Sequence, residues 1–224
     1  MLMPKVSVPT ATIEGTNDRF PVRRIFCVGQ NYADHVREMG GDPERSPPIF
    51  FTKPADAIVE SGSVLSFPSR TDDLHHEVEL VVALGAGGRN VAAADAERLI
   101  FGHAVGIDLT RRDLQAEARK SGKPWDMAKG FDQSAPLGAI KLGAPPVSAK
   151  MSLTVEGEVR QSGDLGDMIW SVAEIIAELS TYVALAGGDL IFTGTPAGVG
   201  PVRRGETVRA TIDGVEPVEV TFAD

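Results

Sequence analysis

The chain has 224 residues, of which 42% are hydrophobic and 24% charged, so we expect a packed core rather than a disordered chain. Its net charge of −9 argues against nucleic acid or an anionic membrane as a partner. No apolar run approaches the roughly 20 residues that span a bilayer, and the N-terminus lacks the apolar core of a signal peptide, so we expect a cytoplasmic protein.

Residues 1–20 are expected to be an extended N-terminal extension, followed by a single domain over 21–224. The apolar run 22–29 predicts a strand that contains Cys27, the single cysteine of the chain. One cysteine excludes an internal disulfide and a cysteine-ligated zinc site. Because its neighbours are apolar, we expect a buried structural thiol rather than a nucleophile.

A short helix is predicted over 32–39, ended by the glycines and proline of 40–43, which could hinge a lid. His35 and Glu38 lie three residues apart and therefore share a face of this helix. A carboxylate beside an imidazole orients the ring and raises its basicity, which suits a general base. A surface ion pair is the alternative.

The segment 47–59 predicts a strand broken by Pro54, with Lys53 more easily explained as a solvated side chain than as a site residue. The next strand, 72–85, alternates, so Glu77 and Glu79 stand side by side on one of its faces. Buried adjacent carboxylates need a positive partner, and Mg²⁺ or Mn²⁺ fits such oxygen ligands. An edge strand with a solvated acidic face remains the alternative.

A helix is predicted over 90–102, with Asn90 as its cap and Gly102 as its stop. The following strand ends at Asp108, a candidate third carboxylate ligand. Beyond it, Arg112 could hold a substrate carboxylate in a bidentate fork, and Gln115 could add a hydrogen bond.

Lys129 could sit in the same pocket as these groups. A charged surface helix is the alternative for the segment around Arg112.

A hairpin is predicted over 150–165, with its turn at 156–157, and one long amphipathic helix over 167–185. The strand 189–193 then opens into a glycine-rich loop that contains Thr195. No Gly-Lys-Ser/Thr follows, so this is not a Walker-type phosphate loop, although its backbone N–H groups could approach an anion. Two closing strands complete a β-rich α+β pattern.

Six ordered segments together resemble the fumarylacetoacetate hydrolase family, and in finer detail its short bacterial fumarylpyruvate hydrolases. They cover residues 26–40, 48–59, 73–85, 102–115, 129–138 and 187–201. The resemblance implies a mixed-sheet roll with one long helix and a short lid helix, a homodimer, and a Mg²⁺ or Mn²⁺ site.

In that resemblance the metal carboxylates fall on Glu77, Glu79 and Asp108. The catalytic lid pair falls on His35 and Glu38. The groups that contact the ligand fall on Arg112, Gln115, Lys129 and Thr195.

The implied reaction is hydrolysis of the C–C bond of a 3-acylpyruvate, with fumarylpyruvate giving fumarate and pyruvate in gentisate-type aromatic degradation. Oxaloacetate decarboxylation, isomerisation or hydration of a related 2-oxo acid, and non-catalytic metal binding are the alternatives. Gln30 stands where relatives often have arginine. The roles of His75, His76 and His103 stay open, with His75 expected to support the carboxylates from the same strand face.

Overall fold

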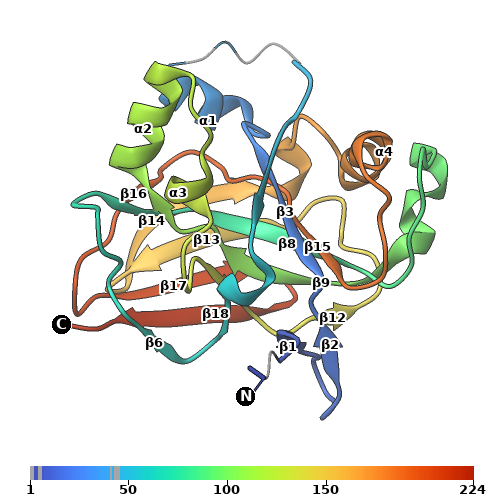
Figure 1. The fold of residues 1–224 in the computed structure, drawn as a ribbon, viewed down its shortest axis with the longest axis horizontal. Coiled ribbons are helices and arrows are strands. Elements are labelled where there is room, and N and C mark those ends of the chain that lie inside the picture. The colour runs from blue at the N-terminus through green and yellow to red at the C-terminus, as the bar shows by residue number, and fades with distance from the viewer. Residues whose placement is uncertain (1–2, 5–6, 41, 43–45) are drawn as a thin grey trace.

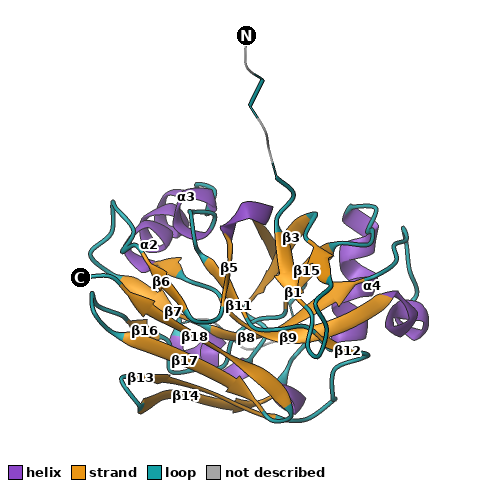
Figure 2. Ribbon diagram, turned by 90° about the horizontal axis from the view of Figure 1, so that it is seen from below, coloured by secondary structure: helices purple, strands orange, loops and turns teal. Residues whose placement is uncertain are grey.

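The computed structural model describes residues 3–4, 7–40, 42 and 46–224, and within them the strands form four sheets. Two of these sheets are large, and they pack face to face into a curled, β-rich α+β roll (Figures 1 and 2). The expected fold class is therefore confirmed.

The larger sheet is mixed, with parallel pairs β15–β3 and β11–β5 among otherwise antiparallel neighbours. The interior strand β8 is the one that carries Glu79. Its strand order is β4 (Ile49–Lys53), β3 (Arg24–Gly29), β15 (Asp189–Phe192), β8 (Val78–Leu84), β9 (Ile100–Ile107), β11 (Ala135–Leu137) and β5 (Ile58–Glu60), with β12 (Lys141–Leu142) also on β9.

The second sheet has five strands and covers one face of β8 and β9. The predicted hairpin is present there, and its turn residues Glu156 and Gly157 have φ values of 51° and 79°. Positive φ at both central positions is the geometry that matches strand twist in a tight hairpin. The order is β14 (Glu158–Asp164), β13 (Lys150–Val155), β17 (Thr207–Ile212), β18 (Val215–Phe222) and β6 (Ser63–Leu65).

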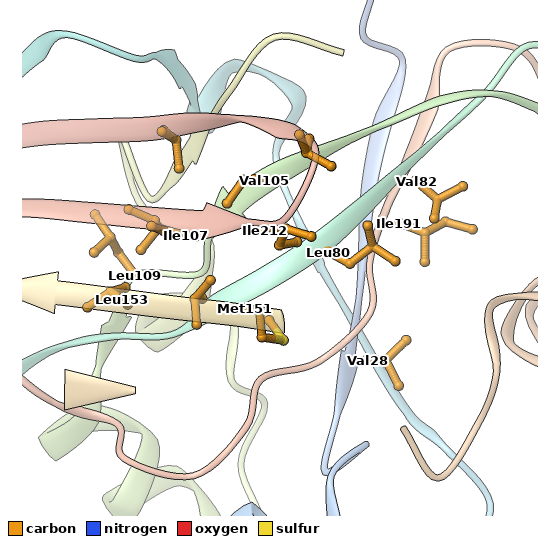
Figure 3. Close-up of a cluster of buried hydrophobic side chains, with 14 of the residues drawn as sticks. Val28, Leu80, Val82, Val105, Ile107, Leu109, Met151, Leu153, Ile191 and Ile212 are labelled. Atoms are coloured by element: carbon orange, nitrogen blue, oxygen red, sulfur yellow. The ribbon is translucent and has the colours of Figure 1, made fainter. Parts of the chain in front are cut away.

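The alternation of β8 divides its side chains between two apolar cores. Leu80 and Val82 face the core beneath the five-stranded sheet, whereas Val81 and Ala83 face a second core behind the larger sheet. Figure 3 shows Leu80 and Val82 among the side chains of the first core, which include Met151 of β13. A strand that is buried on both faces has no solvated acidic face.

Two small sheets complete the fold. β7 (Leu74–His76) lies between β10 (Thr110–Arg111) and β16 (Gly200–Pro201), and β1 (Thr10–Thr12) pairs with β2 (Arg19–Pro21). The predicted continuous strand over 72–85 is therefore two strands, because the chain leaves one sheet and enters another at Glu77. The β1–β2 hairpin begins within residues 1–20, the segment expected to be an extension, ends at Pro21, and buries Phe20.

The helices are short, and α2 and α3 lie at the opposite end of the roll from α4 (Figures 1 and 2). No helix in the described ranges is long and apolar enough to cross a membrane. The α-helices are α1 (Ala33–Glu38), α2 (Arg112–Ser121), α3 (Asp126–Lys129) and α4 (Val172–Tyr182), and the 3-10 turns are η1 (Ala55–Ala57), η2 (Ala93–Leu99) and η3 (Leu165–Asp167).

Two helix predictions need correction. The predicted helix over 90–102 is wrong, because only η2 forms there and Ile100 already pairs with Leu84 in the β8–β9 ladder. The long helix is shorter than predicted, because Ser171 and Glu174 form a capping box that starts α4 at Val172. The helix 32–39 is confirmed as α1, although Gly41 and Pro43, expected to help end it, lie outside the described residues.

Candidate active site

Three carboxylates converge where β8 begins and β9 ends. Glu77 precedes β8, Glu79 lies within it, and Asp108 directly follows β9. The backbone N–H of Asp108 donates to the Glu77 carbonyl oxygen over 2.8 Å, which fixes the two strand ends together. One oxygen from each carboxylate lies within 4.8 Å of the others, and the residues are 5%, 1% and 0% exposed. The alternative of a solvated edge strand is therefore wrong.

Lys129, at the end of α3, reaches into this cluster. Its Nζ lies 2.9 Å from Glu77 Oε2 and 2.6 Å from Asp108 Oδ2, and it donates to the Thr110 hydroxyl over 2.6 Å. Burial by itself would lower the pKa of Lys129, but the carboxylates of Asp108 and Glu77 more than offset it and raise that pKa. Lys129 is therefore a buried ammonium that is held by its acidic neighbours.

Arg112 opens α2 and neutralises the other side of Glu77. Its Nη2 bonds Glu77 Oε1, and its Nη1 donates to Gln115 Oε1 over 2.5 Å. Burial tends to raise the pKa of Glu77, but Lys129 and Arg112 together hold it well below its usual range. Both Arg112 and Gln115 are buried, so the alternative of a wholly solvated surface helix does not hold for this face of α2.

Glu79 has a different environment. Its Oε2 accepts from the Gly194 backbone N–H over 2.8 Å, so the anion that the glycine-rich loop approaches is this carboxylate. Burial, followed by repulsion from Asp108 and Glu77, raises the pKa of Glu79 well above its usual range. Of the three carboxylates, Glu79 is the one that gains most from an added cation.

The cluster fits a divalent cation on its own chemistry. It offers three buried carboxylates and no sulfur or imidazole ligand. Mg²⁺ and Mn²⁺ prefer such oxygen ligands, whereas softer metals prefer sulfur or nitrogen. Asp108 Oδ1 also has no hydrogen-bond partner in the described part of the chain, although Lys53 Nζ lies 2.8 Å away. We regard this contact as an ion pair of poor hydrogen-bond geometry.

Lys53 was predicted to be solvated, and that prediction is wrong. It is 3% exposed, pairs with Asp108, and donates to the backbone carbonyl oxygens of Leu109 and Lys129. Sequence reasoning missed it because a lysine at a strand end before a proline is usually exposed. Its position in an otherwise apolar run was the available signal.

His35 and Glu38 are brought together on α1, with His35 Nδ1 and Glu38 Oε2 3.1 Å apart. The other oxygen of Glu38 accepts from the Gly198 backbone N–H over 3.0 Å, which ties α1 to the glycine-rich loop. His35 is 6% exposed and lines the same pocket as Glu77. The alternative of a simple surface pair does not hold for His35, which is buried, although its partner Glu38 is exposed.

The pocket collects most of the predicted polar groups. From the predicted site residues it is lined by His35, Glu77, Glu79, Arg112, Gln115, Lys129 and Thr195. Gln30 also lines it and has φ of 61°, a left-handed conformation that is unfavourable for a residue other than glycine. Backbone strain of this kind gathers at functional sites.

The three remaining histidines have separate surroundings. His75 Nε2 lies 2.9 Å from Asp73, and its Nδ1 accepts from Arg112 Nε over 3.2 Å. It thus contacts the carboxylate cluster through Arg112. His76 Nδ1 faces Gln161 Oε1 over 3.0 Å, and burial lowers the pKa of His76 to about 4. His103 Nδ1 bonds the Gly143 carbonyl oxygen over 2.9 Å.

The sequence of residues 24–223 matches the family described as fumarylacetoacetate (FAA) hydrolase, C-terminal. The chain belongs to the fumarylacetoacetate hydrolase family. The resemblance inferred from the six sequence segments is thus confirmed.

Within the family, a fumarylpyruvate hydrolase from Pseudomonas aeruginosa, solved with Mn²⁺ and pyruvate, is 48% identical. Its TM-score is 0.97, over 100% of this chain and 99% of that one. Curated relatives include the Escherichia coli oxaloacetate tautomerase YcgM, 42% identical over 87% of this chain and 90% of its own. The human mitochondrial oxaloacetate tautomerase is 44% identical over 89% and 90%.

Two further buried polar residues of this family member went unnoticed in the sequence. Asn31 joins the start of α1 to two other segments, donating to the Thr193 carbonyl oxygen over 2.8 Å and accepting from the Trp170 N–H over 2.7 Å. Gln161 is fully buried on β14. The sequence of β14 gives no clear signal for Gln161, because the neighbouring residues Arg160 and Ser162 are polar as well.

Cys27 is buried on β3, as its apolar neighbours predicted. Burial, aided by the charge of Asp108, raises the pKa of the Cys27 thiol well above its usual range. A thiol held in its neutral form is a poor nucleophile, so the structural interpretation of Cys27 is confirmed.

Proposed function

We propose that this chain is a metal-dependent hydrolase that cleaves the C–C bond of a 3-acylpyruvate. The proposed substrate is fumarylpyruvate, and the products are fumarate and pyruvate. The observation that carries the proposal is the position of His35, which is buried, held by Glu38, and lines the same pocket as Glu77 and Glu79 of the carboxylate triad. The 48% identity to a fumarylpyruvate hydrolase over the whole chain supports the choice of substrate.

Charge balance supports a dianionic substrate. The formal charges of Glu77, Glu79 and Asp108 are matched by three cationic side chains, those of Lys53, Arg112 and Lys129. A bound divalent cation would leave the site with two positive charges. Fumarylpyruvate carries two carboxylates at neutral pH and would neutralise them.

Residues of α1 would activate water in this scheme. Glu38 holds His35 through Nδ1, which leaves Nε2 as the proton acceptor. His35 takes one proton from a water molecule while the water oxygen attacks the distal carbonyl carbon of the substrate. The bond between that carbon and the methylene carbon then breaks, and its electron pair remains on the pyruvate part as an enolate.

The remaining groups would bind the pyruvate part and complete the reaction. Arg112 and Gln115 would hold the carboxylate, and Thr195 would contact it from the glycine-rich loop. Lys129 places a positive charge beside the developing enolate and can return a proton to the methylene carbon. A Mg²⁺ or Mn²⁺ ion, when bound by the triad, would stabilise the enolate charge as a Lewis acid.

Action on oxaloacetate is the second candidate, favoured by the tautomerase relatives at 42–44% identity. Tautomerisation moves a proton between carbon and oxygen and needs no attacking water. It falls in the class of isomerisation of a 2-oxo acid, one of the alternatives that the sequence left open. Decarboxylation of oxaloacetate would use the same enolate.

One paired assay separates these reactions. Purified protein is stripped of metal, supplied with Mg²⁺ or Mn²⁺, and offered fumarylpyruvate or oxaloacetate, while enol absorbance, pyruvate and fumarate are followed. Metal-dependent formation of equal amounts of fumarate and pyruvate supports the hydrolase. Enol loss from oxaloacetate without pyruvate would instead identify a tautomerase, and pyruvate from oxaloacetate a decarboxylase.

We further propose a cytoplasmic homodimer that serves aromatic compound catabolism, as the family resemblance implies. Analytical ultracentrifugation of the purified chain tests the dimer. Loss of growth on a gentisate-forming aromatic compound after deletion of the gene tests the catabolic role.

A further inference from the structure

Gln161 is a fully buried amide between the β13–β14 hairpin and the glycine-rich loop. The hairpin register shifts beside it, since Leu153 pairs with Gln161 whereas Thr154 pairs with Val159. Such a bulge turns one side chain out of the regular alternation. Here Gln161 points inward, away from solvent, among polar groups that border the proposed site.

Backbone groups fix which end of the amide is which. Gln161 Oε1 accepts from the Val78 backbone N–H over 3.0 Å, and Nε2 donates to the Pro196 carbonyl oxygen over 2.9 Å. A backbone N–H can only donate and a carbonyl oxygen can only accept. Exchanging the oxygen and nitrogen of Gln161 would break both bonds, so the amide has one orientation.

That orientation decides the role of Thr195. The second hydrogen of Gln161 Nε2 points to Thr195 Oγ1, 2.8 Å away, so the Thr195 oxygen accepts. A hydroxyl has one hydrogen. Because the Thr195 oxygen accepts from Gln161, the Thr195 hydrogen is free to point toward another acceptor. Thr195 is 3% exposed and lines the pocket with Glu79 and Lys129.

We infer that Gln161 is a positioning residue that makes Thr195 a hydrogen-bond donor to an anionic oxygen of the ligand. The inference rests on the proposed function, because it takes the ligand to be a 2-oxo carboxylate. Without Gln161, the Thr195 hydroxyl could rotate and accept or donate in several directions. A fixed donor selects a carboxylate oxygen over a group that itself donates.

The test measures binding of oxalate, a non-reacting dicarboxylate, to the Mg²⁺-loaded full chain by calorimetry. We expect Gln161→Met and Thr195→Val each to weaken oxalate binding by roughly tenfold or more, as for loss of a hydrogen bond to a charged group. In the Thr195→Val background, Gln161→Met should cost less than about twofold, because the two changes remove one shared bond. Mg²⁺ affinity without oxalate should stay the same in all variants.

Matched variants sharpen the test. Gln161→Glu keeps the acceptor for the Val78 N–H but presents a second acceptor to Thr195, which would draw the Thr195 hydrogen away from the ligand. Gln161→Glu should therefore lose oxalate affinity in the wild-type background but not in the Thr195→Val background. Thr195→Ser keeps a hydroxyl and should lose less affinity than Thr195→Val. Equal losses for Gln161→Met with and without the Thr195 hydroxyl would overturn the inference.

A second measurement does not depend on any Gln161 variant. Neutron diffraction of the wild-type chain with Mg²⁺ and oxalate should place deuterium between Thr195 Oγ1 and an oxalate oxygen. Deuterium directed from Thr195 to Gln161 would overturn the inference while leaving the proposed function intact. Failure of the wild-type chain to bind oxalate would count against the proposed 2-oxo acid site and, with it, the inference.

Discussion

Lys53 Nζ and Asp108 Oδ1 lie 2.8 Å apart, and neither side chain is exposed to solvent. The other oxygen of Asp108 is bound by Lys129, so this carboxylate lies between two buried ammonium groups. Lys53 also bonds the carbonyl oxygen of Lys129, which links the two cations through the backbone. Lys53 thus connects β4 to the end of β9 and to α3.

We predict that Lys53→Met destabilises the metal-free chain by about 3–5 kcal/mol, the cost of removing one partner of a buried ion pair. Lys123→Met is the matched control, since the side chain of Lys123 is 65% exposed and should change stability by about 0.5 kcal/mol or less. Urea denaturation with a metal chelator measures both. Equal stability of the two variants would show that Asp108 does not depend on Lys53.

Lys53 also shows where sequence reasoning reached its limit. Strand alternation correctly placed Glu77 and Glu79 on one face, because the period of two is a local property. Which faces are buried depends on the sheets that pack there. The apolar run around Lys53 is a local signal of a buried strand, but the contacts of the Lys53 side chain with Asp108 and Leu109 join segments far apart in the sequence and needed the structure.

The predicted boundaries of two helices were wrong for the same reason. The alanine-rich stretch before Ile100 favours helix locally, but pairing of Ile100 with Leu84 draws the chain into a long strand. The capping box at Ser171 was readable from its Ser-x-x-Glu spacing, whereas the apolar pattern alone extended the helix too far. Motif order identified the family and fold, and tertiary contacts set the boundaries.

Glu79 gives a prediction on pH. Its raised pKa means that the folded, metal-free chain holds a proton that the unfolded chain releases near pH 4.5. Stability should therefore fall as pH rises above that value, because the unfolded state binds fewer protons. Glu79→Gln removes this penalty and can still accept from Gly194.

In the presence of a chelator, the thermal stability of Glu79→Gln relative to the wild type should increase as the pH rises above about 4.5. Added Mg²⁺ should instead favour the wild type, because the variant loses a carboxylate ligand. Glu97→Gln is the control, since Glu97 is exposed. A stability difference between Glu79→Gln and the wild type that does not change with pH in the presence of chelator would contradict the raised pKa of Glu79.

Gly106 lies opposite Glu79 in the β8–β9 ladder, and a side chain there has no room. An added Cβ would lie 2.5 Å from Val81 Cγ2 and 2.7 Å from Phe192 Cε1. We predict that Gly106→Ala costs about 1–3 kcal/mol of stability through overpacking and weakens Mg²⁺ binding by displacing the end of β9.

Gly200→Ala is the matched control for Gly106→Ala, because its Cβ would meet only His76 Nε2 at 3.6 Å, an ordinary contact. Thermal denaturation and Mg²⁺ titration of both variants provide the comparison. Similar losses in the two variants would mean that general sheet distortion, rather than the missing space at Gly106, governs the effect.

The His35–Glu38 pair gives the prediction closest to the chemistry. His35→Ala should lower fumarylpyruvate hydrolysis by about 10²–10⁴-fold, the usual contribution of a general base, and leave Mg²⁺ affinity nearly unchanged. Glu38→Gln should show a smaller loss, because the ring remains but its orientation and basicity change. Asp34→Ala, an exposed change on the same helix, should retain full activity. Steady-state kinetics and metal titration of the three variants measure this difference, and near-normal turnover by His35→Ala would show that water is activated elsewhere.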